Sequence, residues 1–144
     1  MNLEELLSKG MIEALKIDDN LIKKTINRGE KNLKSAEAIF KSEEYDWTLA
    51  VAYSAMLQAG RALMFSKGYR PKGEYKHLSV IEFIHSEFGD KISSKMIRLF
   101  DNYRKKRNKI VYEEYDIVAG DEAKEAIEFA EELLKIVKKI LAEV

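Results

Sequence analysis

The stretch Trp47–Ser66, WTLAVAYSAMLQAGRALMFS, decides the fold of this chain. When the stretch is read at a helical period, apolar residues fall on almost every side of the helix instead of along one stripe. A helix of this kind is covered by neighbours on several sides, because so much apolar surface is unfavourable in water. We therefore predict a central helix over 47–66, with Asp46 as its N-terminal cap.

Helical periodicity continues on both sides of this stretch. The other predicted helices are a short one within 1–17, weakened by Gly10, one that follows Asp18 or Asp19 and runs to Phe40, one over 76–88 ended by Gly89, one that carries Arg107, and one over 123–141. Glycines and the only proline predict a loop at 68–73, and a second loop is expected at 114–120. No segment shows sustained strand alternation. The prediction is an all-α, antiparallel up-and-down bundle of four to six helices in one domain, 1–144, with its bundle at 20–144.

Composition excludes several classes of site. The chain has 144 residues and no cysteine, so disulfides, thiolate metal sites and cysteine nucleophiles are excluded. Basic and acidic residues number 25 each, so only a local patch could attract nucleic acid. Neither a membrane-spanning run nor a secretion signal is evident, and we expect a cytoplasmic protein without a membrane role. We expect no cofactor and no metal, and we interpret His77 and His85 as surface or capping residues.

One arginine lies on the apolar side of the helix near residue 100. The apolar stripe of that helix is formed by Ile92, Met96, Leu99, Phe100, Tyr103, Ile110 and Val111. Arg107 follows Tyr103 by four residues and falls inside this stripe. A guanidinium keeps its charge when buried, so its donors need a carboxylate, carbonyl oxygens, a phosphate-bearing ligand or a second subunit. The sequence leaves these partners open, including a purely structural ion pair.

Three polar residues follow the same helix beside Arg107. Arg104, Asn108 and Tyr112 are spaced by four residues and share one edge of the helix. Arginine forms forked hydrogen bonds with phosphate oxygens, an amide can orient it, and a phenol adds a hydroxyl or a stacking face. We therefore predict that these four residues bind a nucleotide or RNA. We place Lys105, Lys106 and Lys109 on the solvent side, where they complement the helix dipole.

Two segments resemble the HEPN domain superfamily, the higher eukaryotes and prokaryotes nucleotide-binding domains. The first runs from Tyr45-Asp46-Trp47 through Arg61 to Lys72, and the second is Arg107-Asn108. In that superfamily the Arg-Asn pair is followed after four to six residues by a histidine, and here Tyr112 fills the place of that histidine. The resemblance covers roughly 22–142. It implies a homodimer with a basic cleft at its interface, in the non-canonical branch that pairs with a minimal nucleotidyltransferase.

The resemblance implies two alternative activities, and a stand-alone nucleotide-binding module is a third hypothesis. In the first, the chain is the partner of a minimal nucleotidyltransferase in a toxin-antitoxin or nucleotide-transfer system, and Tyr112 and Tyr115 are candidate acceptors of nucleotide units. In the second, it is a metal-independent ribonuclease that uses Arg107 with Asn108 and Tyr112. A phenol with a pKa of about 10 is a poor general base near neutrality. For this reason we favour the first reading, in which the chain has no catalytic residue, and we interpret both tyrosines as packing or hydrogen-bonding residues.

Overall fold

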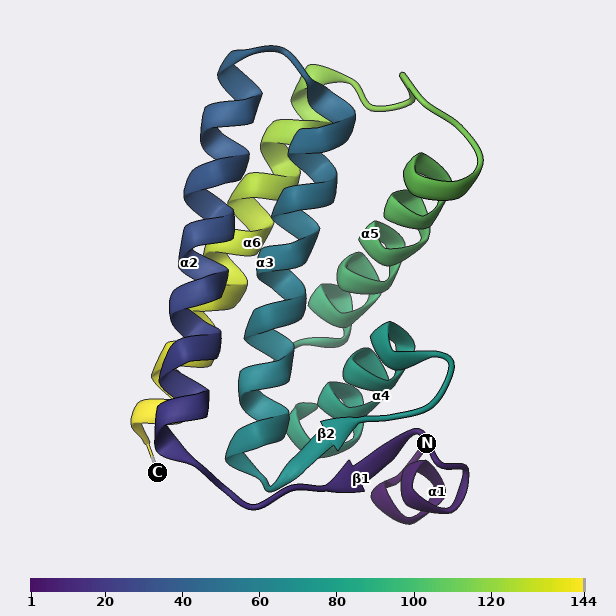
Figure 1. Cartoon of the computed structure of the whole chain (residues 1–144), viewed down its shortest axis with the longest axis vertical. Coiled ribbons are helices and arrows are strands. Elements are labelled where there is room, and N and C mark those ends of the chain that lie inside the picture. The colour runs from purple at the N-terminus through teal and green to yellow at the C-terminus, as the bar shows by residue number, and fades with distance from the viewer. Residues whose placement is uncertain (144) are drawn as a thin grey trace.

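The computed structural model describes residues 1–143, so the predicted end of the domain at residue 144 lies outside the described residues. Within them the chain forms six helices and a two-stranded ribbon (Figure 1). In chain order the elements are α1 (Leu3–Ser8), β1 (Ile12–Ala14), α2 (Asp19–Lys41), α3 (Tyr45–Ser66), β2 (Tyr69–Pro71), α4 (Lys76–Phe88), α5 (Ser94–Tyr112) and α6 (Gly120–Ala142). The predicted all-α bundle is confirmed.

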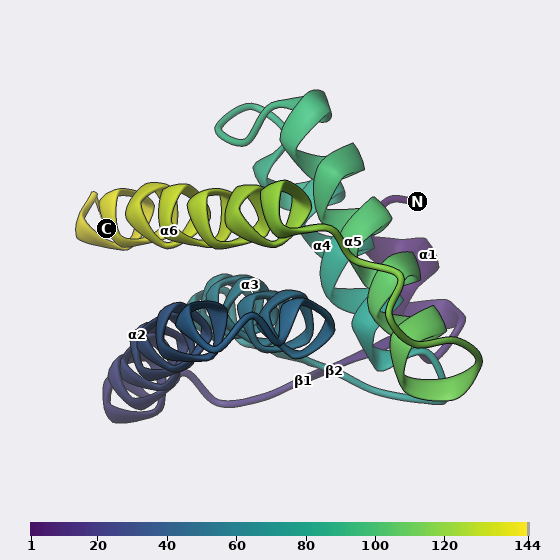
Figure 2. The same ribbon diagram turned by 90° about the horizontal axis from the view of Figure 1, so that it is seen from above.

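The predicted central helix is α3. It packs against α2 and α6 on one side and against α4 and α5 on another. Figure 1 shows α2, α3 and α6 as the three long neighbouring helices, and the view from above in Figure 2 places α4, α5 and α1 together at one side of them. Buried residues are spread around α3, among them Leu49, Ala50, Ala52 and Ala55. The all-round apolar pattern of 47–66 therefore has a direct structural cause.

The N-terminal prediction is wrong in part, because the first helix is shorter than expected. It ends at Ser8, and Gly10 then adopts a positive φ of 68°, a conformation that breaks the helix and favours glycine. The chain continues as β1, which pairs antiparallel with β2 through Ile12↔Pro71, Glu13↔Arg70 and Ala14↔Tyr69. This short ribbon crosses the end of the bundle beside α1 (Figure 1). The apolar residues assigned to one helix therefore belong to a helix and a strand.

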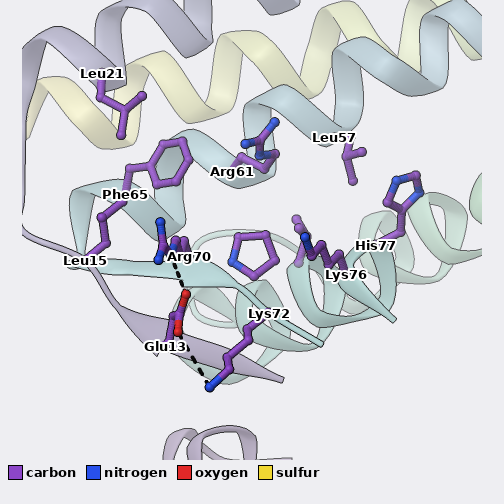
Figure 3. A pocket seen from close by; sticks show the side chains of 12 residues that line it. Glu13, Leu15, Leu21, Leu57, Arg61, Phe65, Arg70, Lys72, Lys76 and His77 are labelled. Carbon is purple, nitrogen blue, oxygen red and sulfur yellow. Dashed lines mark hydrogen bonds and ion pairs between the residues drawn. The ribbon is translucent and has the colours of Figure 1, made fainter. Parts of the chain in front are cut away.

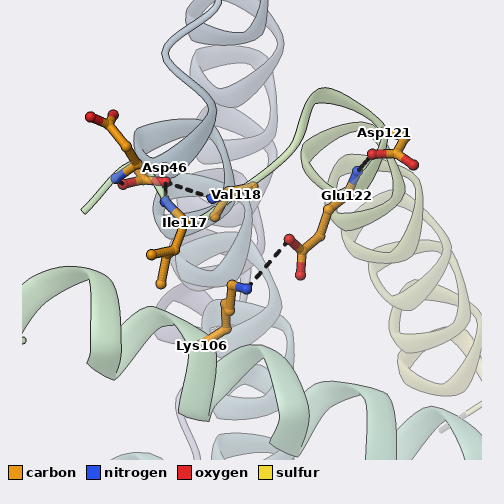
Figure 4. Close-up of polar contacts among 7 residues, drawn as sticks. Asp46, Lys106, Ile117, Val118, Asp121 and Glu122 are labelled. Carbon is orange, nitrogen blue, oxygen red and sulfur yellow. Dashed lines mark hydrogen bonds and ion pairs between the residues drawn. The ribbon is translucent and has the colours of Figure 1, made fainter. Parts of the chain in front are cut away.

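Asp46 does not cap α3, which begins at Tyr45 without a side-chain cap. Its carboxylate accepts hydrogen bonds from the backbone N–H groups of Asp116, Ile117 and Val118, at 3.0 to 3.2 Å for the last two (Figure 4). Asp46 thus fixes the connection between α5 and α6 to the start of α3. The sequence left Asp18 and Asp19 open as the residue before α2, and the structure makes Asp18 the cap, since it accepts hydrogen bonds from the N–H groups at the start of α2.

Helix α4 approaches α3 very closely at Gly60. A Cβ atom at this position would lie 2.4 Å from Val80 Cγ1 and 3.0 Å from Ile84 Cδ1, which is too close for any larger residue without a shift. The close approach brings the beginning of α4 onto the surface of α3.

No helix formed by residues 1–143 combines the length and the apolar character that crossing a bilayer would require.

Candidate functional site

The four predicted binding residues lie together. Arg104, Arg107, Asn108 and Tyr112 line a cleft of about 330 Å³ between the C-terminal half of α5 and the start of α4. The opposite wall is formed by the chain from Glu74 to Leu78. The volume is at the lower end of the range for small-ligand sites. The spacing of these residues along one helix edge therefore predicted a real juxtaposition.

Arg107 is half-buried and faces this cleft instead of entering the core. Among residues 1–143, no carboxylate oxygen lies within 4.0 Å of its guanidinium nitrogens. An ion pair inside the subunit, one of the partners left open by the sequence, is therefore not what satisfies it. Arg104 differs, because its Nε donates to Asp101 Oδ1 at 2.8 Å. Arg107 is thus the cation of this edge that is left available for an external anion.

His77 is a site residue that the sequence analysis missed. It lines the same cleft, and its Nδ1 lies 3.2 Å from the hydroxyl oxygen of Tyr53, with ring centroids 5.6 Å apart. The interpretation of His77 as a surface or capping residue is therefore wrong, whereas His85 is exposed as expected. The start of α4 is carried onto α3 by the close packing at Gly60, and no local pattern in the sequence reveals that contact.

The surroundings of His77 keep its imidazole neutral at neutral pH. Burial lowers the pKa of His77 below its ordinary value of about 6.5, and the positive charges of Arg107, Arg104 and Arg61 lower it further. Burial also raises the pKa of Tyr53 far above that of an ordinary phenol, so Tyr53 stays protonated. The hydroxyl of Tyr53 either donates a hydrogen bond to Nδ1 or accepts one from Nδ1–H. In the second arrangement Nε2 has a free lone pair.

The two candidate acceptor tyrosines are exposed to solvent. Tyr112 is 75% exposed and Tyr115 is 83% exposed, and neither forms a side-chain hydrogen bond in the described part of the chain. The interpretation of these tyrosines as packing or hydrogen-bonding residues is therefore wrong. Val111 is also 42% exposed, so the apolar stripe of α5 ends before it. The end of α5 presents a small apolar and aromatic surface next to the cleft.

The lysines of α5 differ from one another. Lys105 and Lys109 are exposed as predicted, but Lys106 is half-buried and its Nζ lies 3.5 Å from Glu122 Oε1 on α6 (Figure 4). The prediction for Lys106 is wrong because α6 passes close to that side of α5.

Over residues 1–143 no group of three or more His, Cys, Asp or Glu side chains is arranged to hold a metal ion.

Comparisons with known proteins agree with the resemblance seen in the sequence. The family model described as the HEPN domain matches residues 22–140. A Methanocaldococcus jannaschii protein named "Putative toxin MJ0605" is 29% identical over 128 residues, which cover 85% of this chain and 90% of that protein. Another protein of the same organism, named "Putative toxin MJ0142", is 33% identical over 67 residues, 46% of this chain and 44% of that protein. The chain thus matches less than half the length of the second relative.

Proposed function

The chain belongs to the HEPN domain family, and from that premise we propose that it is the toxin-type member of a two-component system. In this proposal it binds a nucleotide or RNA phosphate at the Arg107 cleft and is the partner of a minimal nucleotidyltransferase. The two relatives named as putative toxins support the toxin role. The observation that carries the binding role is the half-buried Arg107, which faces a cleft and has no carboxylate within 4.0 Å among residues 1–143.

The charges around the cleft favour a bound phosphate over a carboxylate side chain of the protein as the partner of Arg107. Arg107, Arg104 and Lys76 place three cations around the cleft, against the single acidic side chain of Glu74 in the described lining. Asn108 adds an amide that can hold the guanidinium in a forked orientation. Tyr112, exposed beside it, offers a ring on which a base can stack. These groups match the backbone and the base of a single-stranded nucleic acid.

Replacing Arg107 with alanine should weaken binding of a labelled single-stranded RNA by about tenfold to a hundredfold, the loss expected for a charge-assisted hydrogen bond. The measurement is fluorescence anisotropy at low and moderate salt, since phosphate contacts give a salt-dependent affinity. Arg98→Ala is the matched control, because Arg98 is an exposed arginine of the same helix outside the cleft. Equal losses in both variants would mean that net charge alone, and not the cleft, governs binding.

We further propose that the chain forms a homodimer and that its nucleotidyltransferase partner modifies it. Transfer of a nucleotide unit requires a reachable hydroxyl, which attacks the α-phosphorus of a nucleoside triphosphate and displaces pyrophosphate. The exposure of Tyr112 and Tyr115 supports this role. A twofold dimer formed at the end of α5 would bring two Arg107 clefts near each other and enclose the apolar surface around Val111.

Co-expression with a minimal nucleotidyltransferase of the same organism should give a complex that co-purifies. Its HEPN subunit should be heavier by whole nucleoside monophosphate units, measured by intact-protein mass spectrometry. Tyr112→Phe combined with Tyr115→Phe should remove the added mass. Tyr75→Phe is the control, since Tyr75 is also an exposed tyrosine of the cleft region. Retention of the added mass in the double variant would exclude these two tyrosines as acceptors. A chain that purifies as a monomer without the nucleotidyltransferase would exclude the pairing.

A second candidate function, metal-independent ribonuclease activity, is favoured by one observation. The cleft contains an imidazole after all, because His77 enters it from α4 beside Arg107 and Asn108. Tyr112 therefore need not act as the base. The direct test is cleavage of single-stranded RNA by the purified chain in the presence of a chelator that removes divalent metal ions, with the Arg107→Ala variant as the inactive comparison.

A further inference from the structure

A second basic cavity lies on the other side of His77. It has a volume of about 630 Å³ and is enclosed by the later half of α3, the β1–β2 ribbon and the start of α4 (Figure 3). Its charged lining consists of Arg61, Arg70, Lys72 and Lys76, with Glu13 as the sole acidic side chain among the described lining residues. Lys76 and His77 line both this cavity and the Arg107 cleft. The two hollows are therefore neighbours.

Arg61 is the residue whose placement the fold does not explain. Its Nε is buried without any hydrogen-bond partner, and its Nη1 reaches only Gln58 Oε1, at a long 3.4 Å. No carboxylate of residues 1–143 lies within 4.0 Å of it, and its guanidinium carbon lies 5.5 Å from the centre of the Phe65 ring. A half-buried guanidinium with unfilled donors carries a cost that a bound anion would remove.

The acidic side chain of the cavity does not serve Arg61. Arg70 Nε donates to Glu13 Oε1 at 2.6 Å, and Lys72 Nζ lies 3.6 Å from Glu13 Oε2 (Figure 3). The hydrogen bond from Arg70 lowers the pKa of Glu13, so this carboxylate is ionised and engaged at neutral pH. These pairs hold the two strands of the ribbon together. One carboxylate is thus shared by two cations, and Arg61 and Lys76 have none in the described residues.

The rest of the cavity wall is apolar. It is formed by Leu15, Leu21, Leu57, Phe65, Pro71 and Val80. A ligand that fills the cavity must therefore join an anionic group to a flat or apolar group of moderate size. Pockets of 300–1,000 Å³ with such a mixed lining hold small organic ligands. An inorganic anion alone would leave most of the apolar wall exposed.

We propose that this second cavity binds a nucleotide, with its phosphates against Arg61 and the two lysines and its base against the apolar wall. The site is separate from the Arg107 cleft and does not depend on it. Because Lys76 and His77 are shared, a nucleotide held here lies next to the cleft proposed to bind RNA. The cavity therefore gives the chain a way to sense or use a free nucleotide beside its nucleic-acid site.

Isothermal titration of the full chain with ATP, in buffer without divalent metal, tests the proposal. We expect saturable binding that Arg61→Met, which keeps an apolar stem of similar length, weakens about tenfold to a hundredfold. Lys72→Glu should weaken binding in the same direction, and it serves if Arg61→Met does not fold, because Lys72 is exposed and the shorter Arg70–Glu13 pair still joins the two strands of the ribbon. Arg98→Ala, at an exposed arginine outside both cavities, should leave the affinity within about twofold, and Arg107→Ala should keep the ATP binding that Arg61→Met weakens.

Three results would overturn the proposal. One is a wild-type chain that shows no heat of ATP binding. Another is inorganic phosphate that binds as tightly as ATP, since the apolar wall would then have no part in recognition. The third is ATP binding that is lost in Arg107→Ala but kept in Arg61→Met and Lys72→Glu, because that pattern moves the nucleotide to the Arg107 cleft. In the third case the RNA-binding function proposed above survives while the second site does not.

Discussion

Replacement of Phe100 with alanine is expected to lower the free energy of unfolding by about 3–5 kcal/mol, the loss typical of a large buried aromatic residue. Phe100 is 2% exposed, and it is the single buried residue of α5, all of which the structure describes. Its ring meets Tyr53 in an edge-on arrangement, with 5.9 Å between the ring centroids. Phe100 is therefore the most deeply buried anchor of the helix that carries the cationic edge, among partly buried side chains such as Leu99 and Tyr103. Urea denaturation followed by circular dichroism measures the loss.

A comparison within the same helix separates this anchor from a general loss of contacts. Leu99 is only half-buried, so Leu99→Ala should cost clearly less, about 1–2 kcal/mol. Phe100→Leu keeps part of the packing and should fall between the two alanine variants. The free energy of unfolding of a domain of this size is about 5–15 kcal/mol, so Phe100→Ala removes a large fraction of it. Similar losses for Leu99→Ala and Phe100→Ala would show that α5 is held along its whole length instead.

The helices were predictable because their signals are local. The apolar residues of 47–66, the cap at Asp18 and the position of Gly89 each act within a few residues of the element that they define. The edge of α5 was predictable for the same reason. Arg104, Arg107, Asn108 and Tyr112 line one cleft because they are spaced along one helix, and no tertiary contact is needed to bring them together.

The ribbon, the partners of Asp46 and the placement of His77 escaped prediction because each depends on contacts between distant segments. The β1–β2 ribbon joins residues more than fifty positions apart, and three residues in each strand are too few for an alternating pattern to be visible. Asp46 looked like a cap because acidic residues are common there, yet its partners lie near residue 117. His77 and Arg61 line cavities because α4 and the ribbon pack against α3. A single helical pattern contains no trace of these approaches.

If the chain cleaves RNA, His77→Gln should lower the rate by about a hundredfold to ten-thousandfold, the range for loss of a general base. In this reaction His77 takes the proton of a ribose 2′-hydroxyl as its oxygen attacks the neighbouring phosphorus. The bond from phosphorus to the 5′-oxygen then breaks, leaving a 2′,3′-cyclic phosphate and a 5′-oxygen that takes a proton from water and becomes a hydroxyl. Arg107 stabilises the charge on the phosphate oxygens. Single-turnover cleavage with a metal chelator present measures the effect.

The pH dependence distinguishes this role from a structural one. A base must be neutral to act, and burial with the nearby arginines holds the pKa of His77 below about 6.5. The cleavage rate should therefore rise with pH up to that pKa and level off above it. Arg107→Ala removes the closest positive charge, so it should raise the pKa of His77, measured by NMR titration of the imidazole, and move any residual cleavage profile to higher pH. Tyr53→Phe, which removes the hydroxyl beside Nδ1, should alter the same titration. A full rate in His77→Gln, or a cleavage profile that does not follow the titration of the imidazole, would rule out His77 as the base and return the cleft to a binding role.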